Sequence, residues 1–376
     1  MENRKIGPLF GDLEKFKIFI QDQIADKNLS QKELRDIRQI IDGLDKADPK
    51  RSWLRDFDLP LYNVVDGRLS LRQYNRSLQV RGPALKLKSI QMDNFGRIAF
   101  SVQGSGPNIL LVHGFPDNQE TWRELVPELV NAGYCVWTVD MPGFGGSELA
   151  SRSKWTPTLG SDFLNHFIRN VIQKETILFG TDVGGVASWN AAFEDGQNDT
   201  GALIKGLVLM NCRPNVSAPV GIELKLLANK TIASMTYGAL LLLNKINRDL
   251  AERTFIASLS RAYEHPYVHH QYATVTSIFK NETNTRNTFA VMKTNQDYLK
   301  RIGDGQAENM QRKIRIPTLI LSSKDKLISK QAMQKFDESI PDSKLAYIPG
   351  PHFAEQEQWL PIAENVVRFL AEKFGS

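Results

Sequence analysis

Asp182 occupies the tip of a glycine-rich turn that follows a short apolar segment. The segment Thr176–Phe179 has the length and composition of a buried strand, and the stretch Val183–Phe193 that leaves the turn is helical in character. A carboxylate is ionised at neutral pH, so it can displace a leaving group at an alkyl carbon without a base and form an ester. A serine in this position would first need a base to remove its proton. The residue type at the turn therefore predicts attack at an alkyl carbon.

Asp325 and His352 are candidates for the groups that hydrolyse such an ester. Asp325 follows the predicted strand Thr318–Ser322, and His352 follows the predicted strand Leu345–Ile348. The carboxyl ends of parallel strands meet at one edge of a sheet, so we expect both residues to lie near the first turn, in the chain order nucleophile, acid and histidine. Taken singly, each has an ordinary explanation as a loop carboxylate, a helix cap or a surface histidine. Their shared position after strands predicts a catalytic triad.

The run His113-Gly-Phe-Pro116 directly follows another predicted strand, Ile109–Val112. Its glycine and proline favour a tight turn that can aim the backbone N–H of Phe115 into the same site. Together with the N–H of Val183, it would form an oxyanion hole, in which fixed donors stabilise charge that develops in a transition state. We expect His113 itself to shape the turn.

From residue 84 onward, apolar strand-like segments alternate with amphipathic helical ones. Strands are predicted over Leu85–Met92, Ile98–Val102, Ile109–Val112, Tyr134–Val139, Thr176–Phe179, Gly206–Met210, Thr318–Ser322 and Leu345–Ile348. Helices are predicted over Trp122–Ala132, Asp162–Val171, Val183–Phe193, Lys330–Ile340 and Leu360–Phe374. This alternation predicts an α/β fold with a mostly parallel eight-stranded sheet and helices on both faces.

Two regions depart from this alternation. Residues 213–312 are helical in character and poor in strands, which predicts a helical lid, or cap domain, over the carboxyl edge of the sheet. Residues 1–83 carry a capping box at Ser30–Glu33 followed by apolar residues at helical spacing, which predicts an N-terminal helical extension. Residues 84–212 and 313–376 then form the core of the fold.

The hydrophobic content and the number of cysteines indicate which classes of protein fit the chain. With 41% hydrophobic residues the 376-residue chain can bury a substantial core, and it contains only two cysteines, Cys135 and Cys212. We therefore expect no disulfide framework, no metal site and no cofactor. The first residues lack the apolar core of a signal peptide, and no apolar run is long enough to span a bilayer. These features predict a cytoplasmic protein without a transmembrane segment.

The net charge of +5 is concentrated in the stretch 61–90. This basic stretch is either a solvated linker or helix face, or a surface for peripheral contact with an anionic partner. We find no nucleic-acid-binding motif and expect no nucleic acid partner. The sequence makes no prediction of the oligomeric state.

Residues 84–376 resemble the α/β-hydrolase fold family, and within it the branch of epoxide hydrolases and haloalkane dehalogenases that use an aspartate nucleophile. The resemblance rests on the motifs H-G-F-P at 113–116, D-x-P-G-x-G-x-S at 140–147 and G-x-D-x-G-G at 180–185, and on the late Asp325 and His352. It implies that Asp182 forms an alkyl ester with the substrate. It also implies that His352, oriented by Asp325, activates the water that hydrolyses this ester.

The two members of this branch differ in how the leaving group is handled. Epoxide hydrolases protonate the epoxide oxygen with two tyrosines of the lid. By this resemblance the candidate donors are Tyr237 and Tyr298, and Tyr263, Tyr267 and Tyr272 compete for the role.

Dehalogenases instead bind the halide with N–H donors, usually a tryptophan that follows the nucleophile and a second residue. Here Val183 follows the nucleophile, and the range 213–312 contains no tryptophan. Phe115 stands where many dehalogenases have an asparagine donor. Val183 also departs from the many epoxide hydrolases that keep a tryptophan there. On balance the resemblance favours epoxide opening over dehalogenation.

The sequence thus predicts a hydrolase that acts on a small lipophilic electrophile, converting an epoxide to a diol. The apolar runs Leu226–Ala228 and Leu240–Leu243 fit such a substrate, although core packing explains them equally well. Two alternatives remain, a haloalkane dehalogenase-like hydrolase and a non-enzymatic binding protein of the same fold whose extension 1–83 docks a partner. The complete set of nucleophile, acid and histidine argues against the binding protein. A serine esterase is the least favoured alternative, because the tip of the turn carries no serine.

Overall fold

The computed structural model describes residues 85–150, 155–198, 201–218 and 282–375, together with the isolated residues 238–240, 242–244, 246, 251 and 255. All of them belong to one compact unit. The predicted extension 1–83, most of the basic stretch 61–90 and much of the predicted lid lie outside the described residues. The domain boundaries and the role of the basic stretch therefore stay predictions.

Eight strands form one sheet in the order β1-β2-β4-β3-β5-β6-β7-β8. Their bounds are Lys88–Met92 for β1, Gly96–Gln103 for β2, Asn108–Val112 for β3, Cys135–Val139 for β4, Thr176–Thr181 for β5, Ile204–Met210 for β6, Thr318–Ser322 for β7 and Ser343–Tyr347 for β8. β2 runs antiparallel to β1 and β4, and all other neighbours are parallel. Each strand overlaps a predicted one, so the prediction of a mostly parallel eight-stranded sheet is confirmed.

The central strands are apolar because helices cover both faces of the sheet. Every residue of β3, β5 and β7 is buried, whereas the edge strand β8 has no fully buried residue. Continuous burial of this kind is typical of parallel strands between two helical layers.

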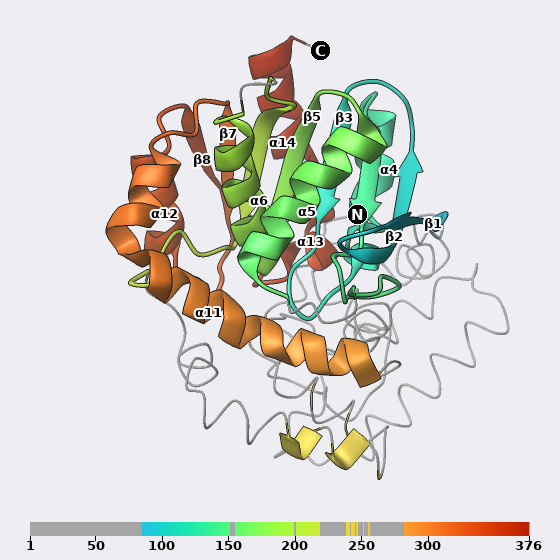
Figure 1. Ribbon diagram of the computed structural model, residues 1–376. Coiled ribbons are helices and arrows are strands. Elements are labelled where there is room, and N and C mark those ends of the chain that lie inside the picture. Colours follow the sequence, from blue (N-terminus) through green and yellow to red (C-terminus); the bar gives the residue numbers. More distant parts are fainter. Residues whose placement is uncertain are drawn as a thin grey trace, which may run out of the picture. The chain divides into compact units, whose positions relative to one another are not determined.

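The helical elements are η4 Gln119–Trp122, α4 Leu125–Asn131, α5 Pro157–Phe167, η5 Ile168–Ile172, α6 Asp182–Asp195, α11 Glu282–Gln311, α12 Lys330–Ser339, α13 Ala354–Glu357 and α14 Trp359–Phe374. α5 and α6 pack together on one face of the sheet, and α4 and α14 pack together on the other (Figure 1). The helix predicted from Asp162 begins earlier, at Pro157, because the side chain of Thr156 caps the N–H of Leu159 and proline suits the first helical turn.

α11 lies in the predicted lid range, between β6 and β7 in the chain. It packs against α5, α6 and α12, and it is kinked at Gly303, whose φ of 66° and ψ of 166° are not helical. The carboxylate of Asp304 accepts hydrogen bonds from the backbone N–H groups of Val216 and Ser217 at 3.0 and 3.1 Å, which fixes the kink to the segment that follows β6. Among the described residues, no helix has the length and hydrophobicity needed to cross a membrane.

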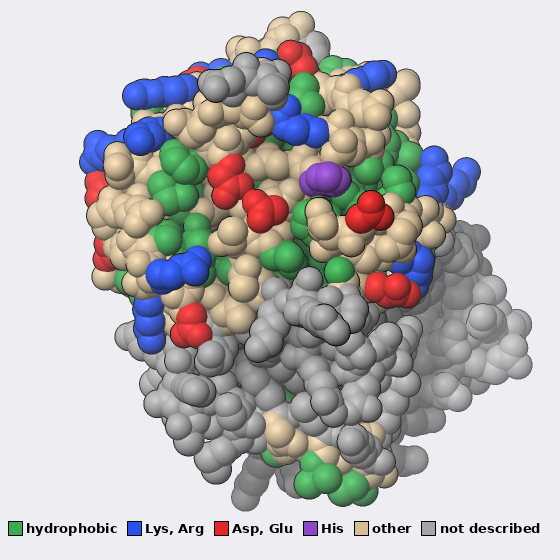
Figure 2. Space-filling view, viewed as in Figure 1, with side chains coloured by type: hydrophobic (Ala, Val, Ile, Leu, Met, Phe, Trp, Pro, Cys, Tyr) green, Lys and Arg blue, Asp and Glu red, His purple; other side chains and the backbone are tan. Residues whose placement is uncertain are grey.

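Charged side chains of both signs are interspersed on the face of the molecule shown in Figure 2. Several form exposed pairs, such as Arg97 with Glu148 and Lys344 with Glu372. Exposed pairs of this kind contribute little to stability. The fold is therefore held mainly by the buried apolar residues on either side of the sheet.

Candidate active site

The chain turns sharply at Asp182, where β5 ends and α6 begins. Asp182 has a φ of 47°, in the left-handed region that costs a non-glycine residue about 1–2 kcal/mol. The surrounding backbone is so close that glycine is required on both sides. A Cβ atom at Gly180 would lie 2.3 Å from the Ser188 hydroxyl oxygen, and one at Gly184 would lie 2.2 Å from the carbonyl oxygen of His113. This is the strained elbow between strand and helix that the sequence predicts, with the carboxylate at its tip.

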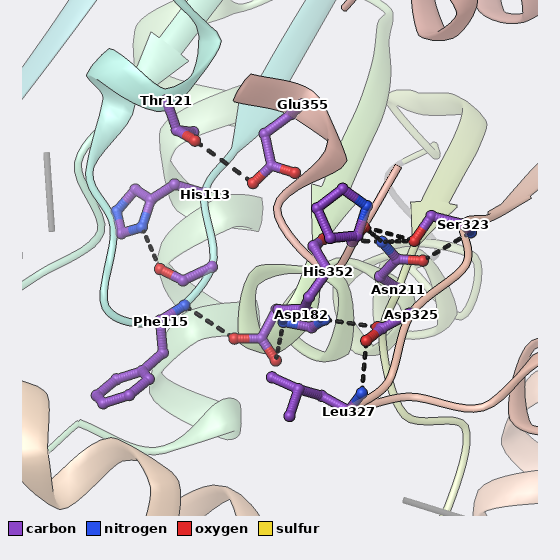
Figure 3. A network of polar contacts seen from close by, with 12 residues as sticks. His113, Phe115, Thr121, Asp182, Asn211, Ser323, Asp325, Leu327, His352 and Glu355 are labelled. Atoms are coloured by element: carbon purple, nitrogen blue, oxygen red, sulfur yellow. Dashed lines mark hydrogen bonds and ion pairs between the residues drawn. The ribbon is translucent and has the colours of Figure 1, made fainter. Parts of the chain in front are cut away.

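The two carboxylate oxygens of Asp182 have different neighbours. Oδ2 accepts a hydrogen bond of 2.9 Å from the backbone N–H of Phe115, whereas Oδ1 faces Nε2 of His352 at 3.8 Å (Figure 3). Burial raises the pKa of Asp182, while the charge of His352 and the N–H groups of Phe115 and Val183 lower it. The N–H groups predicted to form an oxyanion hole thus contact the carboxylate of Asp182 itself.

His352 and Asp325 form a short, buried pair. Nδ1 of His352 lies 2.6 Å from Oδ2 of Asp325, and the two side chains are only 3% and 1% exposed. The other oxygen of Asp325 accepts a hydrogen bond of 2.6 Å from the N–H of Leu327, which orients the carboxylate. This arrangement directs the opposite ring nitrogen of His352 toward Asp182.

The surroundings of His352 favour the imidazolium form. Burial lowers its pKa, but the charge of Asp325, the hydrogen bond to it and the charge of Asp182 more than offset this effect and raise the pKa to about 9. With Asp182 ionised, His352 is therefore positively charged at neutral pH. Any event that neutralises Asp182 removes one of the charges that hold this proton.

Asn211 ties together the chain segments that follow β6, β7 and β8. Its Nδ2 donates to the Ser323 hydroxyl oxygen and to the carbonyl oxygen of His352, both at 2.8 Å, and its Oδ1 accepts from the N–H of Ser323 at 3.1 Å (Figure 3). The Ser323 hydroxyl donates in turn to the carbonyl of Pro351 at 2.6 Å. These bonds fix the backbone that carries His352 against the strand end that carries Asp325.

His113 is a structural residue in this geometry. Its Nδ1 donates to the carbonyl of Gly114 at 2.8 Å, and its Nε2 accepts from the N–H of Met141 at 3.1 Å. Burial lowers its pKa to about 4, so the ring stays neutral. This fits the expectation that His113 shapes the turn that presents Phe115.

Of the two tyrosines predicted to donate a proton to the substrate, only Tyr298 lies among the described residues. Tyr237 lies outside the described residues, as do Tyr263, Tyr267 and Tyr272. The hydroxyl of Tyr298 donates to Oδ1 of Asn190 on α6. Asn190 is two helical turns beyond Asp182, a distance of about 12 Å along the helix axis. The hydroxyl of Tyr298 is thus bound to Asn190, and its role as a proton donor to the substrate stays a prediction.

Several polar residues around the site were not identified from the sequence. They are Asn211, Ser323, Asp117, Thr121, Glu355 and Gln356. Their common signal is position, because each lies within nine residues after the end of a strand. In the part of the chain that the structure describes, no group of three or more His, Cys, Asp or Glu side chains could hold a metal ion.

Comparisons with known proteins identify the fold family of the chain. The family model of the α/β-hydrolase fold matches residues 107–355, more than half of the chain. "Bifunctional epoxide hydrolase 2" of Sus scrofa is 34% identical over 125 residues, which cover 32% of this chain and 22% of that protein. "Epoxide hydrolase" of Caballeronia sordidicola is 37% identical over 91 residues, covering 24% and 28%. The chain thus matches less than a third of the length of these curated relatives.

A solved structure shows the same fold over a larger share of the chain. Haloalkane dehalogenase DbeA of Bradyrhizobium elkani superposes with a TM-score of 0.62 and 15% identity, over 77% of this chain and 99% of that one. At this level of identity the likeness concerns the fold alone. Together with the family model and the sheet order, it shows that the chain belongs to the α/β-hydrolase fold family, within which its sequence resembles the epoxide hydrolases.

Proposed function

We propose that the protein is a hydrolase that forms an alkyl ester on Asp182, and that its substrate is an epoxide, which it converts to a diol. The observation that carries the proposal is that the two carboxylate oxygens of Asp182 have different neighbours. Oδ2 accepts a hydrogen bond from the N–H of Phe115, and Oδ1 faces Nε2 of His352. The likeness to epoxide hydrolases supports the choice of electrophile.

In the first step, Oδ1 of Asp182 attacks a ring carbon of the epoxide. The new C–O bond forms as the ring C–O bond breaks, and the electron pair moves to the ring oxygen. This alkoxide needs a proton. Because Tyr298 donates to Asn190, Tyr237 is the sequence-predicted donor that keeps this role in the proposal.

In the second step, the ester on Asp182 is hydrolysed. Ester formation removes the negative charge of Asp182, so the pKa of His352 falls; the imidazolium gives its proton to the tyrosinate left by the first step, and the neutral ring can then take a proton from water. The hydroxide attacks the carboxyl carbon of Asp182, and the charge develops on Oδ2, where the N–H groups of Phe115 and Val183 stabilise it. Collapse expels the diol together with the former Oδ1, and His352 returns the proton to it. The proton on the new oxygen of Asp182 then passes to His352, which restores the carboxylate and the imidazolium.

The decisive experiment traps the ester. A His352→Gln variant is incubated with a panel of epoxides and alkyl halides, and the intact protein and its peptides are analysed by mass spectrometry. The expected result is an adduct on Asp182 with epoxides, at the mass of the epoxide. The double variant Asp182→Asn/His352→Gln is the matched control and should form none.

Three other outcomes would change the proposal. An adduct only with alkyl halides would assign dehalogenation instead. An adduct that persists in the double variant would remove Asp182 from its role. The absence of any adduct would favour the non-enzymatic binding protein.

Isotope labelling tests separately whether only one oxygen of Asp182 reacts. When the wild-type protein turns over its epoxide many times in water enriched in ¹⁸O, the former Oδ1 leaves with each product and a solvent oxygen replaces it. Because Oδ2 stays bound to Phe115, Asp182 should accumulate one heavy oxygen rather than two. Two heavy oxygens would show that the carboxylate rotates between turnovers and that the contact with Phe115 does not fix its orientation.

A further inference from the structure

A buried polar cluster lies beside His352 and takes no part in the proposed steps. Asp117 follows the H-G-F-P turn, Thr121 belongs to η4, and Glu355 and Gln356 belong to α13. All four side chains belong to residues that are at most 2% exposed. Figure 3 shows the side chains of Thr121 and Glu355 facing each other.

The hydrogen bonds of this cluster can be formed only if one carboxyl group carries a proton. The Thr121 hydroxyl oxygen lies 2.8 Å from Nε2 of Gln356, 3.1 Å from Oδ2 of Asp117 and 3.4 Å from Oε1 of Glu355. Nε2 of Gln356 also lies 2.7 Å from the same oxygen of Asp117.

An amide nitrogen only donates, and a hydroxyl has a single proton. Gln356 therefore donates to Thr121 and to Asp117, and Thr121 gives its proton to the nearer carboxylate, that of Asp117. The remaining contact, between Thr121 and Glu355, then requires Glu355 to be the donor.

The electrostatic surroundings favour the same assignment. Burial is the largest effect on both groups, and it raises the pKa of Asp117 to about 7 and that of Glu355 to about 8. Asp117 raises the pKa of Glu355, Asp182 raises the pKa of both, and the charge of His352 lowers both. Asp117 also accepts the two hydrogen bonds from Thr121 and Gln356, which favour its ionised form.

We propose that Glu355 is held protonated and shares its proton with Asp117 through Thr121, so that the pair presents one negative charge to His352 instead of two. Glu355 and Asp117 are then positioning residues that set the proton affinity of the histidine. An ionised Glu355 would stabilise the imidazolium form. Since His352 must be neutral to act as a base, a neutral Glu355 keeps that base available at lower pH. This kinetic consequence depends on the proposed function.

The kinetic test compares two isosteric variants, Glu355→Gln and Asp117→Asn. The ester is formed by rapid mixing with an epoxide, and the rate of its decay is followed as a function of pH. Glu355→Gln replaces one neutral group by another, so the acid limb of the profile should stay where it is in the wild-type protein. Asp117→Asn removes a negative charge near the imidazolium and should move the acid limb to lower pH by about one unit. A similar shift in Glu355→Gln would show that Glu355 is ionised and would overturn the proposal.

The second test does not depend on activity. Infrared spectroscopy of the resting protein in a Glu194→Gln background should show a protonated carboxyl band at neutral pH that disappears as the pH rises through about 8. The background substitution removes another buried carboxyl, whose pKa is raised to about 7 by burial. The band should be lost in Glu355→Gln, whereas in Asp117→Asn it should remain but disappear at a lower pH, because the charge of Asp117 raises the pKa of Glu355.

The infrared result decides the protonation even if one variant does not fold, because either substitution alone distinguishes a proton on Glu355 from one on Asp117. Absence of the band at neutral pH overturns the proposal, and so does loss of the band in Asp117→Asn alone. If no electrophile forms an ester, the proposed function fails while the infrared titration still decides whether Glu355 holds a proton.

Discussion

Replacement of Asp182 by asparagine tests the charge coupling on which the two-step chemistry depends. The amide keeps the shape of the carboxylate and removes its charge, so the variant resembles the ester state without any substrate. Asparagine is also among the residues that best tolerate the left-handed backbone found at this position, where φ is 47°. The variant should therefore fold, and an intact-mass measurement verifies that the amide persists.

The size of the effect follows from the geometry. Two unit charges 3.8 Å apart, the distance between Oδ1 of Asp182 and Nε2 of His352, interact by about 4 kcal/mol at an effective dielectric constant of about 20. This energy corresponds to about three pKa units. Because the side chain of Asp182 is 12% exposed, solvent screens part of the interaction. We expect the pKa of His352 to fall from about 9 by about one to three units.

The assay is an NMR titration of the imidazole nitrogens in the wild-type protein and in Asp182→Asn. The resonances of the exposed His166 on α5 should be the same in both proteins and serve as an internal control. A change of less than about half a unit in the pKa of His352 would refute the reasoning, because formation of the ester could not then convert the histidine from an acid to a base.

The same titration has a consequence for stability. The folded-state pKa of His352 lies above the ordinary value of 6.5, so its charge pairing stabilises the fold fully below pH 6.5 and is lost as the pH rises through about 9. This loss should be smaller in Asp182→Asn, in which the folded-state pKa is closer to 6.5.

Three further substitutions test the parts of the site that position these groups. Asp325→Asn should slow decay of the trapped ester by about 10³-fold or more, because an amide favours the wrong imidazole tautomer; a wild-type rate in a single-turnover assay would contradict this. Asn211→Ala should lower the free energy of unfolding by about 2–4 kcal/mol, measured by urea denaturation, since it removes the bonds to Ser323 and to the carbonyl of His352; unchanged stability would show that these bonds contribute nothing net. Gly184→Ala should abolish soluble folded protein, because its Cβ would lie 2.2 Å from a carbonyl oxygen, whereas Gly196→Ala, whose Cβ would meet nothing closer than 3.4 Å, should fold normally. Normal folding of Gly184→Ala would disprove the close packing of the elbow.

Much of the fold follows from local patterns in the sequence. The strands could be predicted because helices cover both faces of the sheet, so that β3 and β5 are apolar without interruption. Asp182, Asp325 and His352 could be placed together because each follows a strand, and the carboxyl ends of parallel strands share an edge.

The direction of Tyr298 could not be predicted in the same way. Its hydroxyl is directed by the packing of α11 against α6, and α11 changes course at Gly303. Sequence spacing gives the number of residues between a tyrosine and the next strand, but not the face that a kinked helix presents to its neighbour. The protonation of Glu355 was equally inaccessible, because a buried glutamate and an exposed one look alike in a sequence.

The number of buried carboxyl groups around His352 explains why two of them must share a proton. Asp182, Asp325, Asp117 and Glu355 all lie close enough to influence the imidazole or one another. A single imidazolium cannot offset four negative charges in a poorly solvated environment, so at least one carboxyl group must hold a proton. Asp325 is bound by His352 and Leu327, and Asp182 accepts a hydrogen bond from Phe115, which favours the ionised form of Asp182. The pair of Asp117 and Glu355 therefore holds the proton. When ester formation neutralises Asp182, the pKa of His352 falls.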